Sequence, residues 1–128
     1  MSIAITHIAV YVTDLEKARD YYINYFDGKS NALYQNDDGF SSYFITFDSE
    51  VRLELMHHTQ LENREVIDKV NGFSHVAFSV GSKEKVIEIT DRITADGYKL
   101  YSSPRLTGDG YFESCVADPD GNRIEITE

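Results

Sequence analysis

Apolar and polar residues alternate in several short segments, and two of these segments are copies of each other. Residues 6–12 read THIAVYV, and residues 74–80 read SHVAFSV. Alternation with a period of two predicts β-strands, because successive side chains of a strand point to opposite faces. Each strand carries its histidine at the same place, on the face opposite to its larger aliphatic side chains. The two strands therefore present equivalent polar faces.

Each of these strands is followed by an amphipathic segment that ends at a glycine. Residues 13–28 and 81–97 both repeat apolar residues at helical spacing, which predicts one helix in each. In the first, Thr13 and Glu16 have the spacing of a capping box, and Gly28 suits the position after the helix. The expected apolar faces comprise Leu15, Ala18, Tyr22 and Phe26 in the first helix and Val86, Ile89, Thr90 and Ile93 in the second.

A second pair of blocks extends the repeat. Residues 37–55 align without gaps with residues 108–126, so that RLEL in the first block meets RIEI in the second. Repetition over this length indicates two copies of one supersecondary unit. Strands are expected near residues 4–12, 30–35, 40–47 and 51–58 in the first copy, and near 73–80, 98–102, 111–117 and 122–127 in the second.

The repeat predicts an α+β fold. Two βαβββ modules, at about residues 3–58 and 72–128, are expected to form one domain over residues 1–128 with eight strands. One helix should cover the outer face of each module. The polar linker, at about residues 59–71, is a candidate for partial helix at 61–70.

In each module the last strand places a glutamate on the same face as the histidine. By strand alternation Glu54 belongs with His7, and Glu125 belongs with His75. A sheet with one wet face would leave these side chains in solvent. However, each helix must cover an apolar face, so the polar face is either the inner face of a curved sheet or one side of a cleft between the halves. Converging imidazole and carboxylate groups suit one divalent ion per site, such as nickel, cobalt, zinc, manganese or iron.

Other polar side chains of these segments are candidates for substrate contact. By strand alternation Arg52 and Arg123 flank the glutamates and either assist them or form surface ion pairs. His58 shares the face of Glu54, or is simply an exposed histidine at a strand end. Arg105 and Tyr111 belong to a glycine-containing segment that could be a lid or a plain turn.

Composition argues against two classes of partner, nucleic acid and anionic membranes. The 128 residues carry a formal net charge of −10, which disfavours nucleic acid and anionic membrane surfaces. The start of the chain lacks the features of a signal peptide, and no apolar run reaches membrane-spanning length. The single cysteine, Cys115, excludes an intrachain disulfide and fits a cytoplasmic protein. Its place in an apolar strand predicts a buried, structural side chain.

The two modules, with a histidine on each first strand and a glutamate on each last strand, resemble the vicinal oxygen chelate superfamily. The ending DPDGNRIEI is typical of its members. The resemblance implies paired βαβββ modules that form a U-shaped, eight-stranded mixed sheet. It also implies a homodimer with sites that modules of both chains can share. The set His7, Glu54, His75 and Glu125 is most similar to the metal ligands of bacterial glyoxalase I. The resemblance makes Glu125 the favoured proton-transferring base and Glu54 its counterpart.

Glyoxalase I converts the hemithioacetal of a 2-oxoaldehyde and a thiol into a thioester through an ene-diolate. Two positions depart from the glutathione-using members. Tyr11 stands where those members have arginine, and His58 stands where they have asparagine. Both replaced residues help to anchor glutathione. The alternatives are therefore another reaction of the superfamily, such as isomerisation, thiol transfer or dioxygenation, or non-catalytic binding of a small molecule as in bleomycin-resistance proteins.

Overall fold

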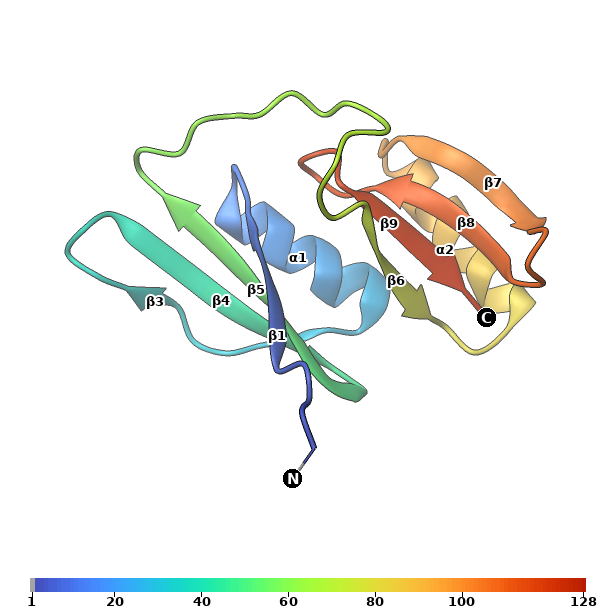
Figure 1. Ribbon diagram of the computed structural model, residues 1–128, viewed down its shortest axis with the longest axis horizontal. Helices are drawn as coiled ribbons and strands as arrows, with labels where there is room; N and C mark the ends of the chain where they lie inside the picture. The colour runs from blue at the N-terminus through green and yellow to red at the C-terminus, as the bar shows by residue number, and fades with distance from the viewer. Residues whose placement is uncertain (1) are drawn as a thin grey trace. The chain divides into compact units, whose positions relative to one another are not determined.

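The computed structural model describes residues 2–128 and contains two compact units, the first ending at Arg64 and the second beginning at Glu65. This boundary falls within the polar segment that separates the two sequence repeats. Each unit combines one helix with one sheet (Figure 1). No helix among residues 2–128 is long and apolar enough to cross a membrane.

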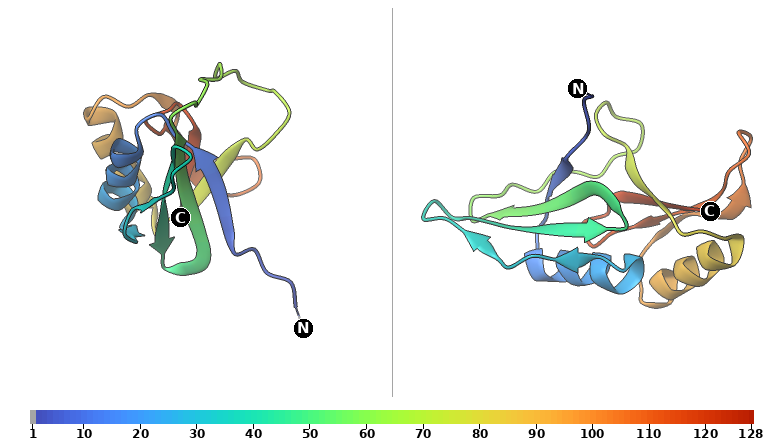
Figure 2. Two further views of the ribbon diagram at one scale, coloured as in Figure 1. Left: turned by 90° about the vertical axis from the view of Figure 1, so that its left-hand side faces the viewer. Right: turned by 90° about the horizontal axis from the view of Figure 1, so that it is seen from below.

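The first unit is a five-stranded sheet with one helix on its face (Figure 2). The strand order is β1-β5-β4-β2, and β3 also pairs with β4. Strand β1 runs parallel to β5, whereas the other pairs are antiparallel. The elements are β1 (His7–Tyr11), α1 (Leu15–Phe26), β2 (Lys29–Ser30), β3 (Tyr34–Gln35), β4 (Phe40–Phe47) and β5 (Ser49–His58).

The second unit repeats this arrangement with four strands. The strand order is β6-β9-β8-β7, with β6 parallel to β9 and the remaining pairs antiparallel. Thus the first strand of each module lies at a sheet edge and pairs with the last. The elements are β6 (His75–Ser79), α2 (Lys83–Ala95), β7 (Leu100–Leu106), β8 (Phe112–Ala117) and β9 (Arg123–Thr127).

The α+β class and the two βαβββ modules are confirmed, and two strand predictions need correction. The strand expected at 30–35 is two short strands, β2 and β3, so that residues 2–128 form nine strands instead of the expected eight. Between them, the side chain of Asn31 accepts a hydrogen bond from the backbone N–H of Phe44. The strand expected at 98–102 is β7, which continues through Pro104 to Leu106. Proline is tolerated there because β7 is an edge strand with register shifts between Leu100 and Arg105.

Helix α2 buries the predicted face. Helix α1 differs at both ends and in part of its face, because Tyr21 and Tyr25 are buried whereas the predicted Leu15 and Phe26 are only partly buried. Asp14, not Thr13, caps α1 by accepting a hydrogen bond from the backbone N–H of Lys17. The carboxylate of Glu16 instead accepts a hydrogen bond from the hydroxyl of Tyr43. Asp27, not Gly28, takes the left-handed conformation that ends the helix. The buried residues are Ala18, Tyr21, Tyr22 and Tyr25 in α1, and Val86, Ile89, Thr90 and Ile93 in α2.

The helix considered for residues 61–70 is absent from that segment. An isolated helix of this length is marginal unless an apolar face packs against the rest of the protein. Of the apolar side chains of the segment, Val66, Ile67 and Val70 are exposed and Leu61 is only partly buried. The segment therefore lacks the packing that would stabilise a helix.

The pattern of buried residues shows which side chains of β5 and β9, the last strand of each module, face the core. In β5, Leu53 and Leu55 are buried, and in β9, Ile124 and Ile126 are buried. Because neighbouring positions of a strand point in opposite directions, Glu54 and Glu125 lie on the faces turned away from these cores. The helices thus cover one face of each sheet, and the candidate ligands occupy the other.

Candidate metal centre

In the first unit the predicted histidine and glutamate meet. Strands β1 and β5 pair in parallel, with His7 opposite Arg52 and Ala9 opposite Glu54. The small side chain of Ala9 leaves room on this face. The Nε2 atom of His7 lies 3.6 Å from the Oε1 atom of Glu54. Both side chains remain partly accessible to solvent, 39% for His7 and 16% for Glu54.

The second unit repeats this pair. In the β6–β9 pairing, His75 lies opposite Arg123 and Ala77 lies opposite Glu125. The Nε2 atom of His75 is 3.2 Å from the Oε2 atom of Glu125. The register therefore places the two His–Glu pairs at equivalent positions of their modules, as the sequence repeat predicts.

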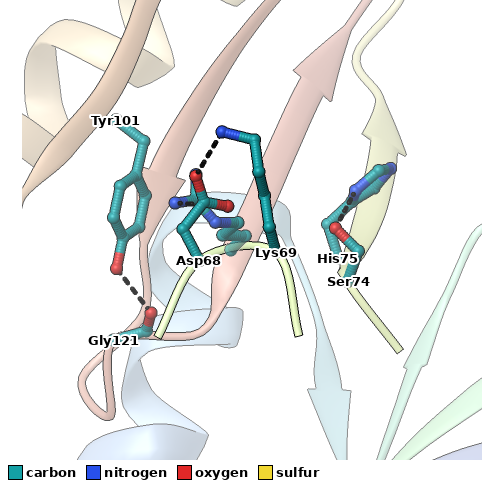
Figure 3. Close-up of polar contacts among 7 residues, drawn as sticks. Asp68, Lys69, Ser74, His75, Tyr101 and Gly121 are labelled. Carbon is teal, nitrogen blue, oxygen red and sulfur yellow. Dashed lines mark hydrogen bonds and ion pairs between the residues drawn. The ribbon is translucent and has the colours of Figure 1, made fainter. Parts of the chain in front are cut away.

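A hydroxyl group holds the other ring nitrogen of each histidine. The Oγ1 atom of Thr6 is 2.9 Å from Nδ1 of His7. In the second module, the Oγ atom of Ser74 is 3.1 Å from Nδ1 of His75 (Figure 3). A hydroxyl can donate to a bare ring nitrogen or accept from a protonated one. It can therefore hold the tautomer that carries its proton on Nδ1, which leaves the Nε2 lone pair available to an ion.

The donor atoms of each pair suit a first-row divalent ion. At metal–ligand distances of about 2.1 Å, two ligand atoms at right angles are about 3 Å apart. The nitrogen–oxygen distances of 3.6 Å and 3.2 Å are close to this spacing. In residues 2–128 no cluster of three or more His, Cys, Asp or Glu side chains has the geometry to hold an ion. Each module thus presents a pair of donors.

Removing the hydroxyl beside either histidine is expected to weaken nickel binding. Thr6→Val and Ser74→Ala should each raise the dissociation constant about 10- to 100-fold, because partners of metal-binding histidines fix their ring orientation. Isothermal titration with nickel measures this effect. Thr6→Ser keeps the hydroxyl and serves as the control. Dissociation constants within twofold of the unchanged protein for both variants would show that these hydroxyls have no such role.

The surroundings of the two pairs differ between modules. In the first, Phe44 lies opposite Glu54 in the β4–β5 pairing. The rings of Phe44 and His7 make an edge contact, with centroids 5.4 Å apart. The Phe44 ring makes a second contact with Arg52, whose guanidinium carbon lies 4.5 Å from the ring centroid. The Phe44 ring therefore packs beside the His7–Glu54 pair.

In the second module, a cysteine takes the position equivalent to Phe44, and a further carboxyl group lies nearby. Cys115 lies opposite Glu125 in the β8–β9 pairing, and Glu113 is two residues away on the same strand. Burial raises the pKa of the Glu113 carboxyl, and the charge of Glu125 and a hydrogen bond to it raise that pKa further. Burial also raises the pKa of the Cys115 thiol, which fits the predicted structural role.

The two other candidate arginines, Arg123 and Arg105, contact residues near them in the second unit. Arg123 pairs with Asp68 at 3.4 Å and stacks on the Tyr101 ring at 4.0 Å. The Tyr101 hydroxyl in turn donates to the backbone oxygen of Gly121 (Figure 3). Arg105 lies on β7, where its Nη1 donates to the backbone oxygen of Glu113 at 3.3 Å.

The other substrate-contact candidates lie at the ends of strands. Tyr11, the last residue of β1, is exposed. At the end of β5, the Nδ1 atom of His58 accepts from the backbone N–H of Gln60, and its Nε2 lies 3.8 Å from Asp38. Tyr111 is exposed in the turn between β7 and β8. A hydrogen bond from the backbone N–H of Thr107 to the backbone oxygen of Tyr111 closes this turn. This segment forms a short hairpin turn.

Three residues near the His–Glu pairs, Thr6, Ser74 and Glu113, were not predicted from the sequence, although a pattern in the sequence pointed to each. Thr6 and Ser74 are both hydroxyl residues immediately before a repeated histidine. Glu113 alternates with Ser114, whose hydroxyl contacts Thr90 of α2, so Glu113 must face the other side of β8. Applying the alternation rule to β8 as well as to β9 would have placed it beside Glu125.

Two βαβββ modules with equivalent His–Glu pairs define a paired-module α+β protein. Residues 4–126 match the family model described as the Glyoxalase/Bleomycin resistance protein/Dioxygenase superfamily, and the chain belongs to that superfamily. This confirms the resemblance seen in the sequence. Among relatives, the uncharacterized protein YqjT of Bacillus subtilis (strain 168) is 30% identical over an alignment of 132 positions that covers 94% of this chain and 94% of that one.

Solved structures share the fold. The glyoxylase/bleomycin resistance protein/dioxygenase domain from Frankia sp. EAN1pec superposes with a TM-score of 0.84 at 17% identity, covering 99% of this chain and 98% of that one. The trypanothione-dependent glyoxalase I of Leishmania major gives a TM-score of 0.79 at 21% identity, covering 99% and 87%. The superfamily thus includes enzymes of the glyoxalase I type.

Proposed function

We propose that the protein is a metal-dependent enzyme that isomerises the hemithioacetal of a 2-oxoaldehyde and a thiol to a thioester, as a lactoylglutathione lyase does. The observation that carries the proposal is the His–Glu pair repeated in both modules, with Nε2 facing a carboxylate oxygen each time. Together the pairs supply His7, Glu54, His75 and Glu125 to one ion, from modules of one chain or of two.

A divalent ion, when bound, supplies a Lewis acid toward the two neighbouring oxygens of the substrate. The carboxylates of the chain do the proton transfer. Glu125 removes the proton from the carbon that bears sulfur and oxygen and returns it to the neighbouring carbon, with Glu54 as its counterpart in the other module. Atoms and electrons balance, because the product thioester is an isomer of the substrate.

The thiol partner of the substrate is expected to differ from glutathione. Tyr11 and His58 stand where glutathione-using relatives carry arginine and asparagine, and the structure gives His58 local partners, Gln60 and Asp38. This observation also favours a second candidate, another metal-dependent reaction of the superfamily such as isomerisation, thiol transfer or dioxygenation. Oxygen consumption by iron-loaded protein would favour the dioxygenase over the isomerase.

We further propose a cytoplasmic homodimer that acts on small molecules. Large apolar side chains before the first strand of each module, Ile3, Ile5 and Phe73, are exposed in the single chain. Burying them between two copies would remove apolar surface from water. Sedimentation equilibrium at a mass of twice 14.6 kDa would support the dimer, and the mass of one chain would refute it.

Titration of metal-free protein with nickel tests the proposed function. The unchanged protein should bind nickel tightly at one site per pair of modules, and His75→Ala should lose the tight site because one of four donors is gone. His57→Ala is the matched control, since the Nδ1 atom of His57 is engaged with the backbone oxygen of Val12, 2.9 Å away. No tight site in the unchanged protein would refute the metal-dependent enzyme and favour a non-catalytic binding protein.

A further inference from the structure

Arg52 is a half-buried cation beside the first His–Glu pair. It lies two positions before Glu54 on β5 and directly opposite His7 on β1. Among residues 2–64, no carboxylate lies within ion-pair distance of its guanidinium group. Its charged end instead lies over the ring of Phe44, 4.5 Å from the centroid.

The repeat supplies a direct comparison for this residue. Arg123 occupies the equivalent position in the second module and also stacks on an aromatic ring, that of Tyr101. However, Arg123 has an acidic partner, Asp68, at 3.4 Å. Both modules therefore carry an arginine stacked on an aromatic ring at this position. Of the two, only Arg52 lacks an acidic partner within its own unit.

The unpaired copy has the properties of an anion-binding group. Guanidinium is always charged and presents a planar fork of donors that matches carboxylate and phosphate. Contact with a ring face holds this fork in place without consuming its outward-facing N–H groups. The chain as a whole carries a net charge of −10, so acidic groups are abundant, yet none of those in residues 2–64 occupies this position.

We propose that Arg52 binds an anionic group, a carboxylate or a phosphate, of the substrate whose neighbouring oxygens face the His7–Glu54 pair. This inference rests on the proposed function and adds the charge of the substrate to it. Arg52 then selects anionic thiols or oxo acids over neutral ones. Arg123, already paired with Asp68, does not share this role.

Two matched chelators test the inference on nickel-loaded protein. Benzohydroxamate and 4-carboxybenzohydroxamate present the same two neighbouring oxygens, and only the second adds a carboxylate. The unchanged protein should bind the carboxylated compound about tenfold more tightly, as a charge-assisted hydrogen bond to a bidentate donor predicts. In Arg52→Gln this preference should fall to within about twofold, while the affinity for benzohydroxamate stays the same. Arg52→Lys should keep part of the preference.

Arg123→Gln is the control, and it should keep the full preference. An equal preference in Arg52→Gln and the unchanged protein, or no preference in the unchanged protein, would overturn the inference while leaving the nickel site intact. If no nickel binds, the proposed function fails separately. The inference is then tested on metal-free protein with inorganic phosphate. The side-chain N–H resonance of Arg52 should shift saturably and that of Arg123 should not, and an unmoved Arg52 resonance overturns the inference.

Discussion

Glu125→Gln is expected to lower turnover of hemithioacetals by the nickel-loaded protein about 10²- to 10⁴-fold, the usual contribution of a general base. Glutamine keeps the shape and one oxygen of the side chain but cannot accept the proton. Glu125 is the proposed base, and a second carboxyl group, Glu113, lies beside it and hydrogen-bonds with it. The measurement is kcat with several thiols, together with nickel stoichiometry of each variant.

Glu54→Gln is the matched comparison in the other module. Its carboxylate lies opposite Phe44, a ring that cannot exchange protons. We expect a smaller loss of kcat than for Glu125→Gln, with nickel still bound. A larger loss in Glu54→Gln would assign the base to the first module instead. Unchanged turnover in both variants would exclude carboxylate base catalysis at these positions.

Ile93→Ala is expected to lower the free energy of unfolding by about 2–5 kcal/mol, the range for truncating a large aliphatic residue in a core. Ile93 lies on the face of α2 that covers the second sheet and has no exposed surface. The alanine leaves a cavity, because Val86 and the other core residues around the helix cannot move freely to fill it. Urea denaturation followed by circular dichroism measures the loss.

Ile87→Ala provides the control on the same helix. Ile87 is 45% exposed, so the same truncation should cost no more than about 0.5 kcal/mol, as usual for a surface substitution. Equal losses for the two variants would mean that α2 does not pack on the sheet through the Ile93 face. Neither substitution touches the candidate ligands, so nickel affinity of the folded protein should stay unchanged in both.

Much of the candidate site was predictable because strand alternation acts over a few residues. Once the repeat identified the first and last strands of each module, parity alone put His7 with Glu54 and His75 with Glu125. The structure places both pairs within 3.6 Å. The apolar face of α2 was predicted for the same reason, since helical periodicity depends only on local spacing.

Predictions failed where several local solutions have similar energies. Thr13 and Asp14 are both good helix caps. Asp14 takes this role, and Glu16, which a capping box with Thr13 would use, instead accepts a hydrogen bond from the distant Tyr43. The polar segment 61–70 could form a helix by composition, but three of its apolar residues, Val66, Ile67 and Val70, remain exposed. In such places tertiary contacts, which involve residues far away in the chain, decide the outcome.

By itself the sequence determined the repeat, the α+β modules and the face on which each candidate ligand lies, because periodicity is a property of neighbouring residues. Only the tertiary structure decided which side chains surround each ligand. The pairing register brought Phe44 to Glu54 and Cys115 to Glu125, and the path of the chain brought Asp68 to Arg123 but no acid of its own unit to Arg52. Such contacts depend on register and side-chain geometry across strands, which no pattern along a single strand contains.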